Sequence, residues 1–203
     1  MDRFMITHSL LSSWQYAMKG NPYEDATTER DAYSEFLSTL RREPSETTEA
    51  MQNGIEFEDL VTYALSGPID DDDPWYAGAS QIASELKGAT LQFKAKKTVE
   101  ISGMQILLYG RLDALHAGAI TDIKFSKKYE RGKYFDSTQH PMYLELVPEA
   151  DTFTYVISNG TQVWHETYRR DETRSILPIV ATFLDWLRSV GLMDVYKEHW
   201  LAK

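Results

Sequence analysis

The sequence contains no cysteine, which excludes disulfide bonds, zinc sites with thiolate ligands and cysteine-ligated iron–sulfur clusters. It also lacks any apolar run close to the ~18 residues that a membrane-spanning helix requires. Residues 1–8 do not form the apolar segment of a secretory signal peptide. Together these absences lead us to expect a cytoplasmic protein that has no membrane partner.

Positive charge is also scarce, because 21 lysine and arginine residues stand against 31 aspartate and glutamate residues and leave a formal net charge of −10. A surface this acidic disfavours a protein that coats nucleic acid non-specifically. It is compatible with an enzyme that has a local basic channel. The length of 203 residues and the hydrophobic content of 42% are typical of one globular domain with a substantial core.

The hydrophobic pattern predicts a single α/β domain over residues 1–203. It would consist of a mainly helical part (1–88), a small mixed β-sheet that carries the active site (89–168) and C-terminal helices (169–203). Four helices are predicted in the first part, beginning near Thr7 or Ser9, after Thr27-Thr28, at Ser45 and near Trp75. The acidic stretch 68–74 could bind calcium, but its carboxylates lack the ordered spacing of a calcium loop, which favours a solvated loop.

From residue 89 onward, period-two alternation predicts strands. One strand covers about 91–101, with a bulge near Lys96-Lys97. Asn159-Gly160 is predicted to join a hairpin between 152–158 and 162–168. Three helices are predicted here, over about 137–146, from a cap at Asp171 with a kink at Pro178, and over 194–201.

A second predicted hairpin carries the first sign of chemistry. A two-residue turn at Ala117-Gly118 places Asp113 directly opposite Asp122. Like charges that face each other across a ladder destabilise it, because their Cβ atoms lie only about 5 Å apart. Period two also puts Lys124 on the same face as Asp122. We therefore predict a divalent-cation site between the two carboxylates.

Glu58 is the candidate for a third carboxylate ligand. It falls in the middle of a stripe on the helix predicted from Ser45, and that stripe would face inward. The stripe consists of Met51, Ile55, Glu58, Thr62 and Leu65. A lone buried carboxylate costs several kcal/mol or becomes neutral, so a bound cation would explain its position. The alternative is a rotated stripe that leaves Glu58 at the rim.

Three carboxylate ligands, with the carbonyl of Ile123 as a fourth ligand, suit Mg²⁺ or Mn²⁺. Such an ion lowers the pKa of a bound water and shields the charge of a scissile phosphate. Lys124 could orient that water, relay its proton or stabilise the pentacovalent phosphate. The alternative for Lys124 is an ordinary salt bridge to Asp122 on the face of the strand.

Four short motifs occur in one order along residues 54–143. They are Gly54-Ile55-Glu56-Phe57-Glu58, Gly110-Arg111-Leu112-Asp113, Ile120-Thr121-Asp122-Ile123-Lys124 and Gln139-His140-Pro141-Met142-Tyr143. Their combination resembles the PD-(D/E)XK nuclease superfamily, and within it the RecB-type branch that includes phage-type exonucleases and CRISPR-adaptation nucleases. The helix predicted near Ser9 is similar to the opening helix of that branch. The resemblance implies a restriction-endonuclease-like core, with a helical N-terminal region and helices that flank the sheet.

The resemblance also implies roles for individual residues, namely metal ligands, a catalytic lysine and residues that support the site and the DNA strand. The metal ligands would be Glu58, Asp113 and Asp122, and the catalytic lysine would be Lys124. Gln139 and Tyr143 would support the site and the DNA strand. Many RecB-type relatives hold an iron–sulfur cluster through cysteines, and this chain has none. The implied activity is that of a Mg²⁺- or Mn²⁺-dependent deoxyribonuclease. It would be an exonuclease of phage or prophage DNA recombination, replication or repair, in the host cytoplasm if phage-encoded.

A basic segment follows the strand that carries Lys124. Lys127, Lys128 and Arg131 lie where a DNA backbone would pass, which makes them candidate DNA contacts. The alternative is a solvated loop balanced by Glu130. The expected partners are DNA and a recombination or single-strand-binding protein. The competing interpretation of the whole chain is a catalytically silent nuclease fold that binds DNA or a partner protein.

Overall fold

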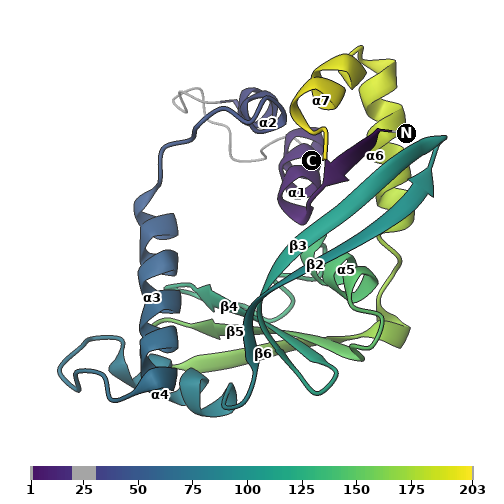
Figure 1. The fold of residues 1–203 in the computed structure, drawn as a ribbon. Coiled ribbons are helices and arrows are strands. Elements are labelled where there is room, and N and C mark those ends of the chain that lie inside the picture. Colours follow the sequence, from purple (N-terminus) through teal and green to yellow (C-terminus); the bar gives the residue numbers. More distant parts are fainter. Residues whose placement is uncertain (1, 20–30, 203) are drawn as a thin grey trace.

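The computed structural model describes residues 2–19 and 31–202 (Figure 1). Within these ranges, seven α-helices flank a mixed sheet of six strands, which confirms the predicted α/β class. No helix in the described part of the chain is both long and apolar enough to cross a bilayer. The predicted helix start at Thr27-Thr28 lies outside the described residues.

The strands are β1 (Arg3–Ile6), β2 (Thr90–Ile101), β3 (Met104–His116), β4 (Ala119–Phe125), β5 (Thr152–Ser158) and β6 (Val163–Arg169). They pair in the order β1-β3-β4-β5-β6, and β2 pairs with the other edge of β3. β1 runs parallel to β3 and β4 runs parallel to β5, whereas the other three pairs are antiparallel.

The helices are α1 (His8–Lys19), α2 (Ala32–Leu40), α3 (Glu49–Ser66), α4 (Tyr76–Glu85), α5 (Gln139–Leu146), α6 (Leu177–Ser189) and α7 (Met193–His199). A side-chain cap explains where two of them begin. The side chain of Asp31 accepts a hydrogen bond at the start of α2, and that of Thr48 does so at the start of α3. As a result, α3 begins at Glu49 rather than at the predicted Ser45.

Strand β3 is the element that positions the site. β2 pairs with it along one edge over residues 104–115, and two other strands share the opposite edge. On that opposite edge, β1 pairs with residues 105–108 and β4 pairs with residues 114–116. Within the described chain, residues 109–113 therefore have no strand partner on this edge. The candidate site lies along this gap in the sheet.

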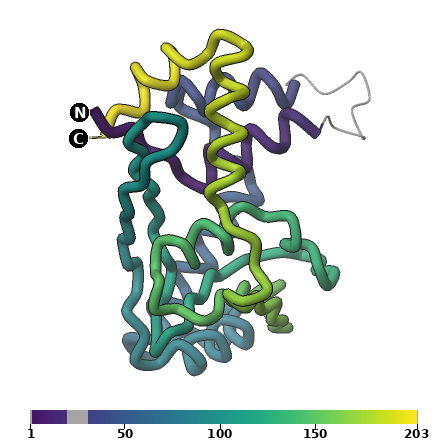
Figure 2. Tube along the Cα trace, turned by 90° about the vertical axis from the view of Figure 1, so that its right-hand side faces the viewer, coloured from purple at the N-terminus to yellow at the C-terminus, as the bar shows by residue number. Residues whose placement is uncertain are grey.

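Two hydrophobic clusters lie along the sheet. The larger one joins α1, α2, α5, α6 and α7 to the strands, and the smaller one joins α3 and α4 to them. The long β2–β3 ribbon runs from the part of the sheet beside α3 and α4 to the helices around α1, α6 and α7 (Figure 1). The chain ends lie side by side (Figure 2), since the amide of Met5 donates a 2.7 Å hydrogen bond to the carbonyl of Trp200.

Several details of the secondary structure differ from the prediction. The prediction of a bulge near Lys96-Lys97 is wrong, because the β2–β3 register runs without a shift from Phe93 to Ile101. The kink at Pro178 is also wrong. Pro178 lies in the first turn of α6, where its missing N–H costs no helical hydrogen bond. Asp171 belongs to a short 3₁₀-helix and does not cap α6.

Two further differences concern strands. β1 has no counterpart in the sequence prediction, and it pairs with only four residues of β3. The loop between β5 and β6 covers residues 159–162, because Ser158 pairs with Val163, so it is longer than the predicted Asn159-Gly160 turn. Neither difference moves the residues of the candidate site.

Candidate metal centre

A cavity of about 340 Å³ opens along the unpaired edge of β3. The predicted metal ligands, the predicted catalytic lysine and the two supporting residues from α5 all line it. They are Glu58, Asp113, Asp122, Ile123, Lys124, Gln139 and Tyr143. The remaining lining residues are Thr7, His8, Ser9, Tyr109, Gly110 and Arg111, from the start of α1 and from β3. Five elements, α1, α3, β3, β4 and α5, thus contribute side chains to one cavity.

The turn at Ala117-Gly118 sets the positions of the two aspartates. Both turn residues have positive φ, 44° and 81°, as a type I′ hairpin turn requires. The hairpin has the predicted register, which extends as far as Ala114–Thr121 and stops one step before Asp113 and Asp122. At that step, Asp113 Oδ2 accepts a 2.8 Å hydrogen bond from the backbone N of Ile123. A side-chain hydrogen bond thus replaces backbone pairing at the point where the ladder ends.

Asp122 lines the cavity and is buried, with only 2% of its surface exposed. Gln139 Nε2 donates a short hydrogen bond to its Oδ1 atom. Lys124 Nζ lies 2.7 Å from its Oδ2 atom. The ammonium group uses one lone pair of Oδ2 at most, which leaves the other lone pair of this oxygen without a partner in the described part of the chain. A buried carboxylate oxygen that keeps a lone pair available fits a cation ligand.

Lys124 is held as a cation at the same place. Burial by itself would lower the pKa of its ammonium group, but Asp122 beside it and Asp113 nearby outweigh burial and raise the pKa. The salt bridge to Asp122 is the contact that the structural alternative for Lys124 requires. Because Lys124 also lines the cavity, the same contact would hold its charge next to a bound substrate.

Helix α3 is rotated relative to the predicted stripe. Its buried residues are Phe57 and Val61, whereas Met51 and Ile55 are 53% and 51% exposed. The inward stripe is therefore wrong, and the rotated alternative holds. Glu58 is half-buried and still lines the cavity, and its burial raises the pKa of its carboxyl group.

The three carboxylates repel one another when no cation lies between them. Burial raises the pKa of Asp113 to about 8, and the charges of Asp122 and Glu58 add to the effect. The hydrogen bond from the Ile123 amide offsets only part of this rise. Asp113 is thus mainly protonated at pH 7 without a cation, and a divalent ion would displace that proton. This donor set fits a hard cation.

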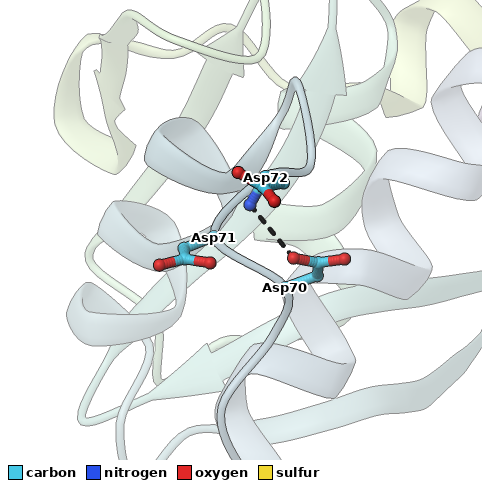
Figure 3. A group of neighbouring side chains, drawn as sticks. All are labelled: Asp70, Asp71 and Asp72. Atoms are coloured by element: carbon cyan, nitrogen blue, oxygen red, sulfur yellow. Dashed lines mark hydrogen bonds between the residues drawn. The ribbon is translucent and has the colours of Figure 1, made fainter.

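A different acidic group has the tighter spacing. Among the described residues, Asp70, Asp71 and Asp72 are the only three possible ligands whose oxygens all lie within 4.8 Å of one another (Figure 3). Glu58, Asp113 and Asp122 are spaced more widely. All three residues of the acidic group are exposed, and the amide of Asp72 donates a 3.0 Å hydrogen bond to Asp70 Oδ1. This is the side-chain turn of a solvated loop.

Tyr143 supports the site from α5. It is only 3% exposed, and its hydroxyl donates a 3.0 Å hydrogen bond to the carbonyl of Arg111 on the unpaired edge of β3. A Cβ atom at Gly110 would lie 2.5 Å from the Tyr143 ring, so the ring requires glycine there. Tyr143 and the buried Gln139 thus connect α5 to β3 and β4. Direct contact of either residue with DNA stays a prediction.

The basic segment has a fixed shape although its cations are exposed. Lys127, Lys128 and Arg131 all face solvent. The backbone between and after them is held by Glu166 on β6, which is 7% exposed. Its carboxylate accepts hydrogen bonds from the hydroxyls of Tyr129 and Tyr168 and from the amides of Gly132 and Tyr134. These bonds outweigh burial and lower the pKa of Glu166.

Three residues at the site are absent from the sequence prediction. Arg111 is exposed and lines the cavity, and its position two residues before Asp113 in a strand is a signal that could have found it. Burial lowers the pKa of His8 to about 4, so its ring is neutral at pH 7. Gln92 donates a 2.6 Å hydrogen bond to Glu58. No sequence pattern distinguishes His8 or Gln92.

Comparisons with known proteins bear on the fold alone. No protein-family model matches the sequence, and no curated protein matches it. A solved structure described as the crystal structure of SSO0001 is similar in fold, with a TM-score of 0.53 and 14% sequence identity. The similarity covers 93% of this chain and 78% of that chain. It supports the α/β architecture and leaves the activity to be argued from the site.

Proposed function

We propose that this chain is a Mg²⁺- or Mn²⁺-dependent deoxyribonuclease that hydrolyses phosphodiester bonds in the cytoplasm, acting from DNA ends. The observation that carries the proposal is the meeting of Glu58, Asp113 and Asp122 with Lys124 at one cavity in the sheet. A site that only binds an anion would have no use for three carboxylates. A site that only holds a cation would have no use for a half-buried lysine beside its ligands.

The ion would be held by the three carboxylates and the Ile123 carbonyl. When bound, it shields the charge of the scissile phosphate and lowers the pKa of a coordinated water. The proton on Asp113 leaves when the ion binds, because only the carboxylate form is a ligand. Gln139 keeps Asp122 in place through its hydrogen bond to Oδ1, which leaves Oδ2 facing Lys124.

Lys124 is the residue that would act on the phosphate. Its ammonium group can donate a hydrogen bond to a non-bridging oxygen and stabilise the negative charge that develops there during attack. Arg111 can contact a second phosphate from the same side of β3, because it is exposed and lines the same cavity. The exposed cations Lys127, Lys128 and Arg131 would then bind the backbone beyond the cavity.

The proposal is tested with end-labelled linear DNA and circular DNA, each single- and double-stranded, in Mg²⁺ or Mn²⁺. We expect linear DNA to be degraded and circular DNA to stay intact, with no product in EDTA or with Asp122→Asn. Cleavage of circles would replace the exonuclease assignment with an endonuclease. If neither form is cleaved although the chain binds DNA, the catalytically silent alternative becomes the better function.

A further inference from the structure

Gln92 has a left-handed backbone in the interior of a strand. Its φ angle is +52°. Three other non-glycine residues of the described chain have positive φ, and they lie beyond a helix end or in hairpin turns: Arg42, Ser102 and Ala117. Such a conformation is unfavourable for a residue with a side chain, and it persists only where the surroundings impose it. Gln92 in β2 therefore needs a local cause.

The position of Gln92 in the register indicates that cause. Leu91 pairs with Ala114 and Phe93 pairs with Leu112, which places Gln92 opposite Asp113. This one step is missing from a ladder that is otherwise continuous. The two neighbours of Asp113 also differ in their packing, since Leu112 belongs to the larger hydrophobic cluster and Ala114 to the smaller one. The β2–β3 pairing is thus interrupted only at Asp113, the residue whose carboxylate lines the cavity. Irregularities of this kind in other strands redirect a side chain.

The side chain of Gln92 makes a contact that spans two elements. Its Nε2 atom donates a 2.6 Å hydrogen bond to Oε1 of Glu58, which lies on α3. Apolar packing holds this face of α3 only in part, because Met51 and Ile55 on the same stripe are exposed, whereas Leu65 packs against the smaller hydrophobic cluster. The buried anchors, Phe57 and Val61, lie to one side of the stripe. The orientation of the Glu58 carboxylate therefore depends on its polar contacts.

We propose that Gln92 is a positioning residue of the metal centre, and this role rests on the proposed function. By giving up its place in the ladder, Gln92 directs its amide at Glu58 and leaves Asp113 free to turn toward Asp122 and Ile123. A single residue of β2 thereby fixes two of the three carboxylates, one through its side chain and one through its backbone. Substitution of Gln92 would lower the affinity of the site for the ion without removing any ligand.

The test compares two substitutions of Gln92 that both remove the amide but differ in how well they tolerate a positive φ. Gln92→Ala and Gln92→Gly both lack the amide, but glycine adopts positive φ without strain whereas alanine does not. Calorimetric titration with Mn²⁺ should show an affinity about 10–100-fold below wild type for both variants, the usual effect of losing a hydrogen bond to a metal ligand. The melting temperature of the Gly variant should exceed that of the Ala variant. If Gln92 had a purely structural role, the Mn²⁺ affinity of each variant would instead change in parallel with its melting temperature.

Two controls make the result specific. Gln105→Ala removes another glutamine amide that contacts a glutamate, Glu100, on the same ribbon but away from the cavity, and it should leave Mn²⁺ affinity unchanged. In a Glu58→Ala background, Gln92→Gly should cause no further loss, because glycine keeps the backbone conformation opposite Asp113 and the lost amide acts through Glu58. Wild-type affinity in both Gln92 variants would overturn the inference while leaving the proposed function intact. Absence of Mn²⁺ binding by the wild type would overturn both.

Discussion

The carboxylate of Asp113 accepts a 2.8 Å hydrogen bond from the backbone amide of Ile123, the residue that follows Asp122. The side chain of Asp113 on β3 thus accepts the hydrogen bond of the first β4 amide that the β3–β4 ladder leaves unpaired. The same contact holds the Asp113 carboxyl close to the charge of Asp122, and burial then raises its pKa to about 8. A proton, or a cation in its place, relieves the repulsion between these two carboxylates.

The first prediction is that Asp113 contributes less and less to the stability of the metal-free protein as the pH rises from about 4 to about 8. The folded state keeps the Asp113 proton up to its pKa of about 8, whereas the unfolded chain releases it near 4. At Asp113 the folded state therefore binds more protons in this window, and the contribution of this group to the free energy of unfolding falls with increasing pH, by at most about 1.4 kcal/mol per pH unit. Urea denaturation in EDTA between pH 5 and pH 9 measures this slope.

The matched variant is Asp113→Asn, whose amide oxygen can still accept the hydrogen bond from Ile123 but carries no titratable proton. The slope of its free energy of unfolding with pH should differ from that of the wild type by the contribution of this one group, being less negative or more positive. Equal slopes for the variant and the wild type would contradict the raised pKa of Asp113. Asp194→Asn, on α7 and remote from the cavity, serves as the control for removal of a surface carboxylate.

The second prediction concerns metal binding. Mg²⁺ or Mn²⁺ should raise the melting temperature by mass action on the folded state, by about 5–10 °C when the free ion exceeds its Kd about 100-fold. Asp113→Ala and Asp122→Ala should abolish the shift, because each removes a ligand. Asp71→Ala, in the exposed acidic loop, should retain it. A shift that depended on Asp71 instead of Asp122 would place the ion in the loop.

Much of the site's arrangement could be predicted from the sequence because local rules determine it. The Ala117-Gly118 turn fixes the hairpin register, and the register places Asp113 opposite Asp122. Period two then places Lys124 beside Asp122, and the i, i+4 spacing puts Gln139 and Tyr143 on one face of α5. These relationships need no knowledge of the rest of the chain.

The features that could not be predicted depend on contacts between distant elements. α3 has apolar residues on two faces, and only the partners of Phe57 and Val61 decide which face is buried. The left-handed φ of Gln92 is imposed by its surroundings, since glutamine has no intrinsic preference for it. β1 is a strand because it pairs with four residues on an edge of β3 that β4 leaves free, and its own sequence contains no alternation that would reveal it.

The third prediction separates catalysis from metal binding. Lys124→Ala should lower the rate of DNA cleavage at saturating substrate by about 10²–10⁴-fold, the usual contribution of a positioned acid–base or electrostatic group. Mn²⁺ binding should persist, because no ligand is lost and removal of a positive charge favours a cation. Lys96→Ala, an exposed lysine on β2, is the control and should cleave normally. Wild-type turnover in Lys124→Ala would show that Lys124 has only its structural salt bridge to Asp122.

The last prediction concerns the basic segment and the residue that shapes it. Lys128→Ala and Arg131→Ala should each weaken DNA binding and reduce the salt dependence of the association constant by about one unit of log–log slope, because each phosphate contact releases a counterion. Turnover at saturating DNA should change little, which distinguishes these residues from Lys124. Fluorescence anisotropy with a labelled oligonucleotide over a range of NaCl concentrations measures the slope.

Glu166→Gln tests whether the shape of the segment matters as well as its charge. The substitution leaves every cation in place but replaces one acceptor oxygen with an NH₂ group, so the hydroxyls and amides that Glu166 now binds cannot all be satisfied. If the segment binds DNA as a preformed surface, affinity should fall although the net charge becomes less negative by one. If charge alone governs binding, the variant should bind DNA at least as tightly as the wild type. Glu130→Gln, on the exposed side of the segment, makes the same change in charge without removing a buried acceptor and should bind more tightly in either case.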